Sequence, residues 1–231
     1  MLVRADGAEL RRLTSDIDRD RGQQWDPAGE RLAIYSTRSG TWEYWSIRVD
    51  GSDLRQLTKL GSADQFSWAP DGRRMIVSGG DVGELLWLID TSRLETAETA
   101  RRIPQPAGAA PNVFSPSAWS RRGDLVAGVV HGLVGQALAC GVLDLTSGAF
   151  RTLDVPTSGP SWTAVAGWLP DARHLVARAP GGVAVIDTAN GEWRIVAPAG
   201  PDDYLSLSRD GRVLSVEREV LDSDIWLMEL P

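Results

Sequence analysis

The chain has little reactive side-chain chemistry: one cysteine, two histidines and one lysine in 231 residues. A single cysteine excludes a disulfide framework within the chain and leaves the redox compartment open. Cys140 lies in the apolar run 137–142, which predicts a buried strand residue rather than a reactive thiol.

Long hydrophobic runs are also missing. No apolar stretch reaches the roughly 18 residues that a membrane-spanning helix needs. Residues 1–3 enter directly into a strand pattern, with no charged and apolar leader. We therefore expect a soluble chain with no membrane insertion and no signal peptide, and its compartment stays unknown.

Positive charge is sparse. The net charge is −7, lysine is nearly absent, and the arginines are scattered rather than clustered. Proteins that hold a phosphate backbone carry a basic patch or stripe. The sequence therefore predicts no nucleic-acid partner.

Motifs of catalysis are absent as well. The sequence has no G-x-S-x-G elbow, no P-loop and no dinucleotide glycine fingerprint. It has no H-E-x-x-H or C-x-x-C pair to support zinc, and no cofactor is predicted. We expect His131 and His174 to be loop or strand residues rather than catalytic bases. The prediction is that the chain is not an enzyme.

The sequence does contain one phrase repeated five times: an anchor residue, a two-residue step, a turn of the Asp-Gly type, and an apolar strand. The anchors are Trp25, Trp68, Trp119, Trp168 and Leu207. They lie 43, 51, 49 and 39 residues apart. A period in the forties, filled with short strands, is typical of propeller blades.

Each repeat contains four short strand patterns with turn signals between them, and no long helical periodicity occurs. We expect residues 93–100 to be a loop insertion and the matching tryptophans to pack between blades rather than to stack on a ligand. The prediction is a single all-β domain over residues 1–231, a five-bladed β-propeller. Its blades are expected at about 15–58, 59–104, 105–155, 156–197 and 198–231, the last completed by 1–14.

The two ends of the chain fit together. Residues 2–14 repeat the pattern of residues 47–58, and the chain closes on a third strand at 225–230. A strand at 10–14 would complete the last blade, seal the ring and remove an exposed edge. A sealed ring predicts a monomer. The strand at 2–5 is then left over, so an incomplete six-bladed ring is the alternative.

The repeats resemble the TolB-like propeller family, whose blades are WD-repeat-like. The phrase Trp-Asp-Pro-Ala-Gly at residues 25–29 is followed by Tyr-Ser-Thr-Arg-Ser-Gly at 35–40. Asp-Gly-Ser-Asp-Leu-Arg-Gln-Leu-Thr then stands at 50–58, which follows the family pattern almost letter for letter. The second repeat matches through residues 68–72.

Later repeats depart from the pattern. Arg121 and Arg209 stand where the family has proline, and Ala172 replaces glycine. The resemblance still spans nearly the whole chain. It specifies a fold more strongly than a function, because the same propeller serves many roles.

The resemblance implies three settings. One is the periplasmic TolB protein of the Tol–Pal system. Another is the C-terminal sensor or scaffold propeller of bacterial serine/threonine kinases and winged-helix regulators, which residues 222–230 and the pair Asp20-Arg21 resemble. The third is the gating propeller of prolyl-oligopeptidase-type peptidases. Within a longer family member the chain would be periplasmic or extracytoplasmic.

One short motif resembles the opening of a calcium loop. Asp16, Asp18 and Asp20 place carboxylates at every second position, as hard oxygen ligands for calcium are placed. The glycine at position 22 falls one place late, and the bidentate Glu at position twelve is missing. We expect a solvated connecting loop and keep a weak calcium site as the alternative.

The candidate site follows from topology. Loops that enter the inner strands of a propeller meet around the mouth of the central channel, and binding residues gather on such loops. Aromatic side chains mixed with carboxylates would suit a peptide or a cationic ligand. The candidate binding residues are Asp20, Arg21, Asp64, Gln65, Asn112, Phe114, Trp162, Asp202, Asp203 and Tyr204. Ordinary solvated loops are the alternative.

The sequence therefore predicts a non-catalytic propeller module for protein–protein interaction or ligand sensing, with a protein or peptide partner. The alternative is an auxiliary propeller of a larger enzyme, a serine/threonine kinase or a prolyl-oligopeptidase-type peptidase. If the channel mouth binds the partner, replacing Phe114 and Trp162 together by alanine should abolish capture without lowering the melting temperature.

Overall fold

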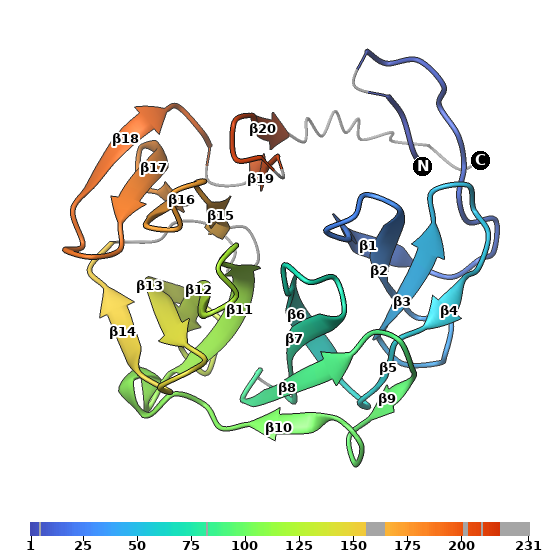
Figure 1. Ribbon diagram of the computed structural model, residues 1–231, viewed down its shortest axis with the longest axis horizontal. Helices are drawn as coiled ribbons and strands as arrows, with labels where there is room; N and C mark the ends of the chain where they lie inside the picture. Colours follow the sequence, from blue (N-terminus) through green and yellow to red (C-terminus); the bar gives the residue numbers. More distant parts are fainter. Residues whose placement is uncertain (5, 82, 156–164, 201–202, 209, 218–231) are drawn as a thin grey trace, which may run out of the picture.

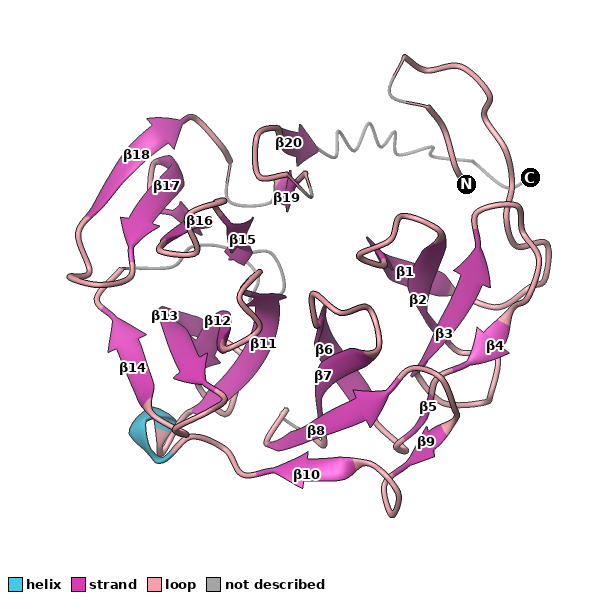
Figure 2. Ribbon diagram, in the orientation of Figure 1, coloured by secondary structure: helices cyan, strands magenta, loops and turns pink. Residues whose placement is uncertain are grey.

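The computed structural model describes residues 1–4, 6–81, 83–155, 165–200, 203–208 and 210–217. Five antiparallel sheets stand side by side around a centre, in the order of the chain (Figure 1). The described residues contain strands, loops and one short 3-10 helix, η1 (Ala107–Ala109) (Figure 2). The all-β propeller fold that the sequence predicts is confirmed.

Four of the sheets have four strands, and the fifth has two within the described residues. The first sheet contains β1 (Asp20–Trp25), β2 (Arg31–Ser36), β3 (Glu43–Arg48) and β4 (Arg55–Gln56). The second contains β6 (Ala63–Trp68), β7 (Arg74–Gly79), β8 (Leu85–Asp90) and β10 (Arg101–Ile103). In each sheet the first strand lies nearest the centre (Figure 1).

The remaining sheets repeat this arrangement. The third contains β11 (Val113–Trp119), β12 (Leu125–His131), β13 (Ala137–Asp144) and β14 (Phe150–Leu153). The fourth contains β15 (Val165–Trp168), β16 (His174–Ala179), β17 (Gly182–Asp187) and β18 (Trp193–Ala197). The fifth contains β19 (Tyr204–Leu207) and β20 (Leu214–Glu217).

The repeated turn forms the hairpin between the first two strands of each sheet. In the second sheet, the Asp71 side chain accepts hydrogen bonds from the Arg73 and Arg74 amides at 2.9 and 3.2 Å. Gly72 follows with φ of 68°, a left-handed conformation that glycine adopts at little cost. Ala172 takes the same place in the fourth sheet with φ of 53°, so the turn keeps its shape without glycine.

The core lies between neighbouring sheets. One buried cluster joins the third and fourth sheets through residues such as Val129 and Leu175, both at most 1% exposed. The Trp168 indole N–H belongs to this cluster and donates to the Ala118 carbonyl of the third sheet at 3.0 Å. Trp68 and Trp119 lie in the clusters between the first and second and the second and third sheets. The predicted packing of these three tryptophans between blades is confirmed.

Trp25 differs from its counterparts. Its side chain is 49% exposed, and every residue of β1 is exposed except the half-buried Asp20. No described sheet packs on this side of the first sheet in the way that the third packs on the fourth. The prediction of an inter-blade tryptophan therefore does not hold for Trp25 among the described residues.

The amino-terminal segment lies against the first sheet. Leu2 and Arg11 form an isolated antiparallel bridge, and Leu2 and Leu13 pack beside Leu32, Ile34 and Ile47. No described residue of this segment pairs with β19 or β20. The third strand expected at 225–230 lies outside the described residues, so ring closure by 10–14 stays a prediction.

The insertion expected at 93–100 is a loop that also holds β9 (Glu95–Thr96). This strand pairs in parallel with β5 (Thr58–Lys59), which joins the first two sheets at the rim. The buried Glu95 carboxylate accepts hydrogen bonds from Thr99 at 2.6 Å and Arg93 at 2.8 Å. Within the described part of the chain, no helix has the length and apolar character that a bilayer crossing requires.

Candidate functional site

The predicted channel-mouth residues occupy the starts of the inner strands. Asp20 and Arg21 open β1, Asp64 and Gln65 follow the first residue of β6, and Asn112 directly precedes β11. Asp203 and Tyr204 stand at the start of β19, on the fifth sheet. Trp162 and Asp202 lie outside the described residues.

Arg21 is the best-prepared binding group at the mouth. Its guanidinium lies over the Trp42 ring at 4.1 Å and over the Tyr35 ring at 5.4 Å. The side chain is exposed, and it forms no ion pair with any residue that the structure describes. Stacking on an indole restrains a guanidinium, and the donors that Arg21 does not share with the Tyr35 hydroxyl can receive a carboxylate or phosphate.

The aromatic side chains beneath Arg21 form one cluster across two sheets. Tyr35 stacks on Trp42 at 4.6 Å between ring centroids and meets Tyr44 at 5.1 Å. Tyr44 meets Phe66 of the second sheet at 4.3 Å. The Tyr35 hydroxyl donates to the Ala63 carbonyl, and the Tyr44 hydroxyl to the Asp64 carbonyl. The cluster therefore fixes β6 against the first sheet directly under Arg21.

Burial makes the hydroxyl groups of Tyr35 and Tyr44 weaker acids. It raises the pKa of Tyr35 to about 12, and the charge of Asp64 adds to this effect. Burial likewise raises the pKa of Tyr44 well above its usual value. Both hydroxyls therefore stay protonated and act as hydrogen-bond donors at neutral pH.

Asp64 brings a carboxyl group into the same region. Burial raises its pKa, while the hydrogen bond from the Gln65 amide at 3.3 Å and the nearby charges of His131 and Arg21 oppose the shift. Arg21 comes from the first sheet, Asp64 from the second and His131 from the third. The mouth thus unites Arg21, Asp64 and Gln65 of the predicted set.

His131 and Ser115 complete this side of the mouth, and no pattern in the sequence predicted that they would meet. The His131 Nδ1–H donates to the Gly132 carbonyl at 3.2 Å, and Nε2 shares a hydrogen bond with the Ser115 hydroxyl at 2.8 Å. Both side chains are buried, at 5% and 2% exposure. His131 ends β12, as expected of a strand residue, and both of its ring nitrogens take part in hydrogen bonds.

Phe114 was wrongly placed among the binding residues. Its side chain is fully buried between the second and third sheets and meets Phe150 edge-on at 5.2 Å. Side chains alternate between the two faces of a strand, and this position faces the core. Replacing Phe114 by alanine would therefore lower stability, contrary to the expectation that the melting temperature would hold.

Asp20 is committed to an internal ion pair. Arg38 lies between the two carboxylates, 2.8 Å from Asp20 and 3.3 Å from Asp16, with its guanidinium 5.3 Å from the Trp45 ring. A guanidinium between two of three supposed ligands does not fit a calcium ion. This ion pair does not favour the calcium alternative at Asp16, Asp18 and Asp20, which stays a prediction. The expected solvated loop agrees with the exposure of residues 15–17 and 19.

The fifth-sheet residues behave differently from each other. Asp203 is 3% exposed and accepts a hydrogen bond from the Gly200 amide at 2.8 Å. Tyr204 is 43% exposed and remains available to a partner. Asn112 is half-buried, and its amide donates to the Ala109 carbonyl at 2.9 Å.

The other reactive residues are placed as the sequence predicts. Cys140 is fully buried in β13, and burial raises the pKa of its thiol to about 12. His174 opens β16 and bonds through Nδ1 to the Asp171 carboxylate at 2.5 Å. That carboxylate also accepts the Arg173 and His174 amides, so the histidine belongs to the hairpin turn.

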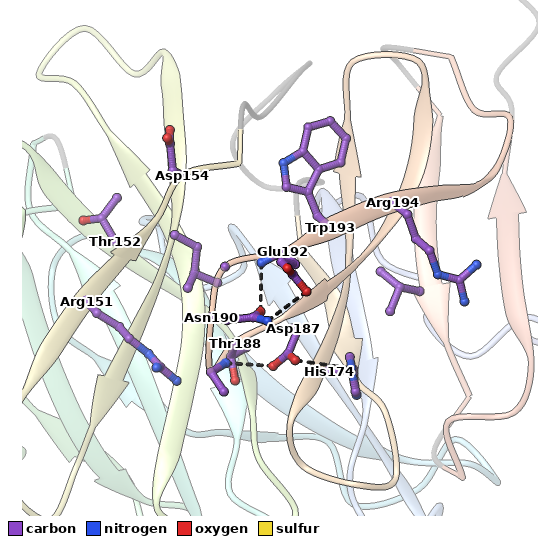
Figure 3. A pocket seen from close by; sticks show the side chains of 14 residues that line it. Arg151, Thr152, Asp154, His174, Asp187, Thr188, Asn190, Glu192, Trp193 and Arg194 are labelled. Atoms are coloured by element: carbon purple, nitrogen blue, oxygen red, sulfur yellow. Dashed lines mark hydrogen bonds and ion pairs between the residues drawn. The ribbon is translucent and has the colours of Figure 1, made fainter.

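A separate open hollow of about 980 Å³ lies at the rim, between β14 and the hairpin of β17 and β18 (Figure 3). None of the residues predicted for binding lines it. Asp187, in its wall, is held by Arg173 at 2.5 Å. Trp193 and Arg194 project from β18 in different directions (Figure 3).

Comparison with known proteins supports the fold. No family model matches the chain. Tricorn protease homolog 1 of Streptomyces coelicolor is 30% identical over 246 residues, which cover 94% of this chain and 22% of that protein. The chain thus spans about a fifth of the length of this curated relative.

Two solved TolB structures are similar. TolB from Acinetobacter baumannii superposes with a TM-score of 0.69 at 20% identity, over 94% of this chain and 53% of that one. The putative TolB from Agrobacterium tumefaciens gives 0.64 at 14% identity, over 92% and 75%. At such identities the likeness establishes the fold, which is that of the TolB-like β-propellers.

Proposed function

We propose that this chain, as a TolB-like β-propeller, is a non-catalytic module that captures a protein or peptide partner at its channel mouth. The proposal rests on the position of the Arg21 guanidinium over the Trp42 ring. An exposed guanidinium 4.1 Å from the centre of the Trp42 ring, without an ion pair among the described residues, is prepared to receive an acidic group. Residues on loops and strand ends of a rigid scaffold commonly serve as binding sites.

The surroundings of Arg21 support a polypeptide rather than a lone anion. Asp64, with its raised pKa, and the Gln65 amide beside it offer a second polar contact. Away from Arg21, Tyr204 at the start of β19 is 43% exposed and offers a separate aromatic surface on the fifth sheet. A segment with an acidic group and neighbouring donors or apolar side chains would use each of these.

Arg21→Ala tests the proposal. The partner is captured from source cells on the immobilised chain, identified by mass spectrometry, purified and titrated against each variant. We expect Arg21→Ala to weaken binding about tenfold or more, since charged hydrogen bonds contribute about 1.5–3 kcal/mol. Arg21→Lys should recover little, because lysine lacks the planar stacking group.

Arg19→Ala is the matched control. Arg19 is an exposed arginine two residues earlier that the structure does not place over an aromatic ring. It should bind like the wild type, and all three variants should keep the wild-type melting curve. Equal binding by Arg21→Ala and Arg19→Ala would reject the channel mouth as the binding site.

A second candidate function has its own support. The chain aligns over 94% of its length with only 22% of a tricorn protease homolog. This favours an auxiliary propeller of a larger enzyme, such as a peptidase or a serine/threonine kinase. An immunoblot of source cells distinguishes the two: a band near 25 kDa supports a separate module, and a much heavier band supports the auxiliary propeller.

A further inference from the structure

The outer strand of the fourth sheet has an unusual free edge. β18 is the last strand of its sheet, and no described strand pairs with its outer side. Three of its five side chains are large, apolar and exposed: Trp193 at 39%, Ile195 at 41% and Val196 at 44%. Such an edge is a ready template for pairing with another strand.

Two of the other outer strands, β4 and β10, are better protected. β4 has two residues, Arg55 and Gln56, and β10 has three, of which Arg101 and Arg102 are exposed. Short edges and exposed charges are common devices that prevent edge-to-edge association. β18 has neither the shortness nor the run of charges, since Arg194 is its one charged residue, and its pairing with β17 becomes irregular only beyond Ile195.

The ladder with β17 shows which backbone groups are available. The Asp187 amide donates to the Glu192 carbonyl at 2.8 Å, and Ile186 and Val185 then pair with Trp193 and Arg194. Because hydrogen-bonded pairs alternate in an antiparallel ladder, the N–H and C=O groups of Trp193 and Ile195 point away from β17. They are free to pair with a further strand.

We propose that this edge pairs with β18 of a second copy of the chain, antiparallel and about a two-fold axis. With Trp193 opposite its own counterpart, Glu192 lies opposite the partner's Arg194, and the reverse pair forms by symmetry. Both charges are available. Arg194 forms no ion pair with a described residue, and Glu192 accepts one side-chain hydrogen bond, from Asn190 at 2.9 Å.

This register places the charges favourably. Trp193 pairs with its counterpart through backbone hydrogen bonds, so Glu192 and the partner's Arg194 occupy a non-hydrogen-bonded pair, where opposing side chains are closest. Trp193 and Arg194 line the open hollow of Figure 3, so the neighbouring third sheet does not cover them. A contact of one short strand buries little area, which predicts a weak dimer.

Sedimentation velocity over about 5–500 µM, a range chosen for a weak interface, tests the pairing. The wild-type mass should rise from 25.0 kDa toward twice that value as the concentration increases. Glu192→Arg and Arg194→Glu should each weaken the dimer about tenfold, because both replace two attractive pairs by two repulsive ones. The double variant should return to the wild-type dissociation constant.

The controls keep the test independent of folding. Arg151→Glu reverses an exposed charge on the neighbouring β14 and should dimerise like the wild type. Trp193→Cys should form a disulfide between copies under oxidation, and the buried Cys140 should not take part. A wild-type mass that stays at 25.0 kDa throughout, or equal association of the single and double variants, would overturn the proposal.

Discussion

The interface between the third and fourth sheets and the outer side of the first sheet use the same repeated tryptophan with opposite results. Trp168 is 5% exposed and bonds to the Ala118 carbonyl across the interface. Trp25 holds the same place in the repeat and is 49% exposed. The repeat thus determines where the tryptophan stands in its own sheet, while the neighbouring sheet determines whether it is buried.

The largest expected difference is in the stability of alanine variants. Trp168→Ala should lower the free energy of unfolding by about 3–5 kcal/mol, because it leaves a cavity in a close-packed cluster. Trp25→Ala should lower it by about 1 kcal/mol or less, because half of that side chain already meets water. Urea denaturation of the two variants and the wild type measures both changes.

Equal losses of unfolding free energy in Trp168→Ala and Trp25→Ala would contradict the difference in burial between the two tryptophans. They would show that another sheet covers Trp25 in solution, as a closed ring requires. Phe114→Ala serves as the reference for full burial, since Phe114 is also fully enclosed between two sheets.

A smaller effect is expected in the repeated turn, where the neighbouring sheet should not matter. Gly72→Ala should lower the free energy of unfolding by about 1 kcal/mol, because a Cβ costs energy at a φ of 68°. The new Cβ would meet Pro27 at an ordinary 3.7 Å, so strain rather than a clash sets the cost.

Ala172→Gly should show the opposite sign and raise the free energy of unfolding by about 0.5–1 kcal/mol. Ala172 already bears the left-handed strain at φ of 53°. Thermal and urea denaturation of both variants give the comparison. A loss of stability in Ala172→Gly would mean that packing of its methyl group outweighs the strain.

The smallest expected effect is a dependence on pH from the first and second sheets. The raised pKa of Asp64 means that the folded chain holds this proton more tightly than the unfolded chain. Protonated Asp64 therefore stabilises the folded chain fully at pH below the ordinary pKa of 3.8. This stabilisation is lost as the pH rises through the raised pKa of the folded chain. Asp64→Asn should remove that loss.

Urea denaturation across acid and neutral pH measures this effect. The stability of Asp64→Asn relative to the wild type should increase as pH rises above 3.8 and become constant once Asp64 is ionised in both states. A relative stability that does not vary with pH would show that the folded and unfolded chains bind this proton equally.

The sequence predicted the sheets well because their signals are local. Each Trp-to-turn phrase lies within one hairpin, and the turn geometry at Asp71 and Gly72 follows from the residues themselves. The exposure of Trp25 was missed because it depends on a neighbouring sheet, which a local phrase does not specify. The difference between Trp25 and Trp168 is a property of the assembled ring.

The candidate site was predicted in part for a related reason. Arg21 and Asp64 stand at strand starts, so topology alone brought them to one face. Trp42 and Tyr35 were missed because they come from a loop and from the end of a neighbouring strand. Phe114 was misassigned because a shift of one residue along a strand turns a side chain from one face to the other.

The chain's single lysine determines how its partners can be sought. Lys59 is exposed in β5 at the rim, so amine-directed cross-linkers would attach only there and at the amino terminus. The one thiol is buried in β13. The chain has 31 Asp and Glu residues. Carbodiimide coupling of these carboxylates to a partner's amines therefore has many more possible cross-linking sites than lysine chemistry does. An engineered cysteine would likewise carry a probe without competition from a second exposed thiol.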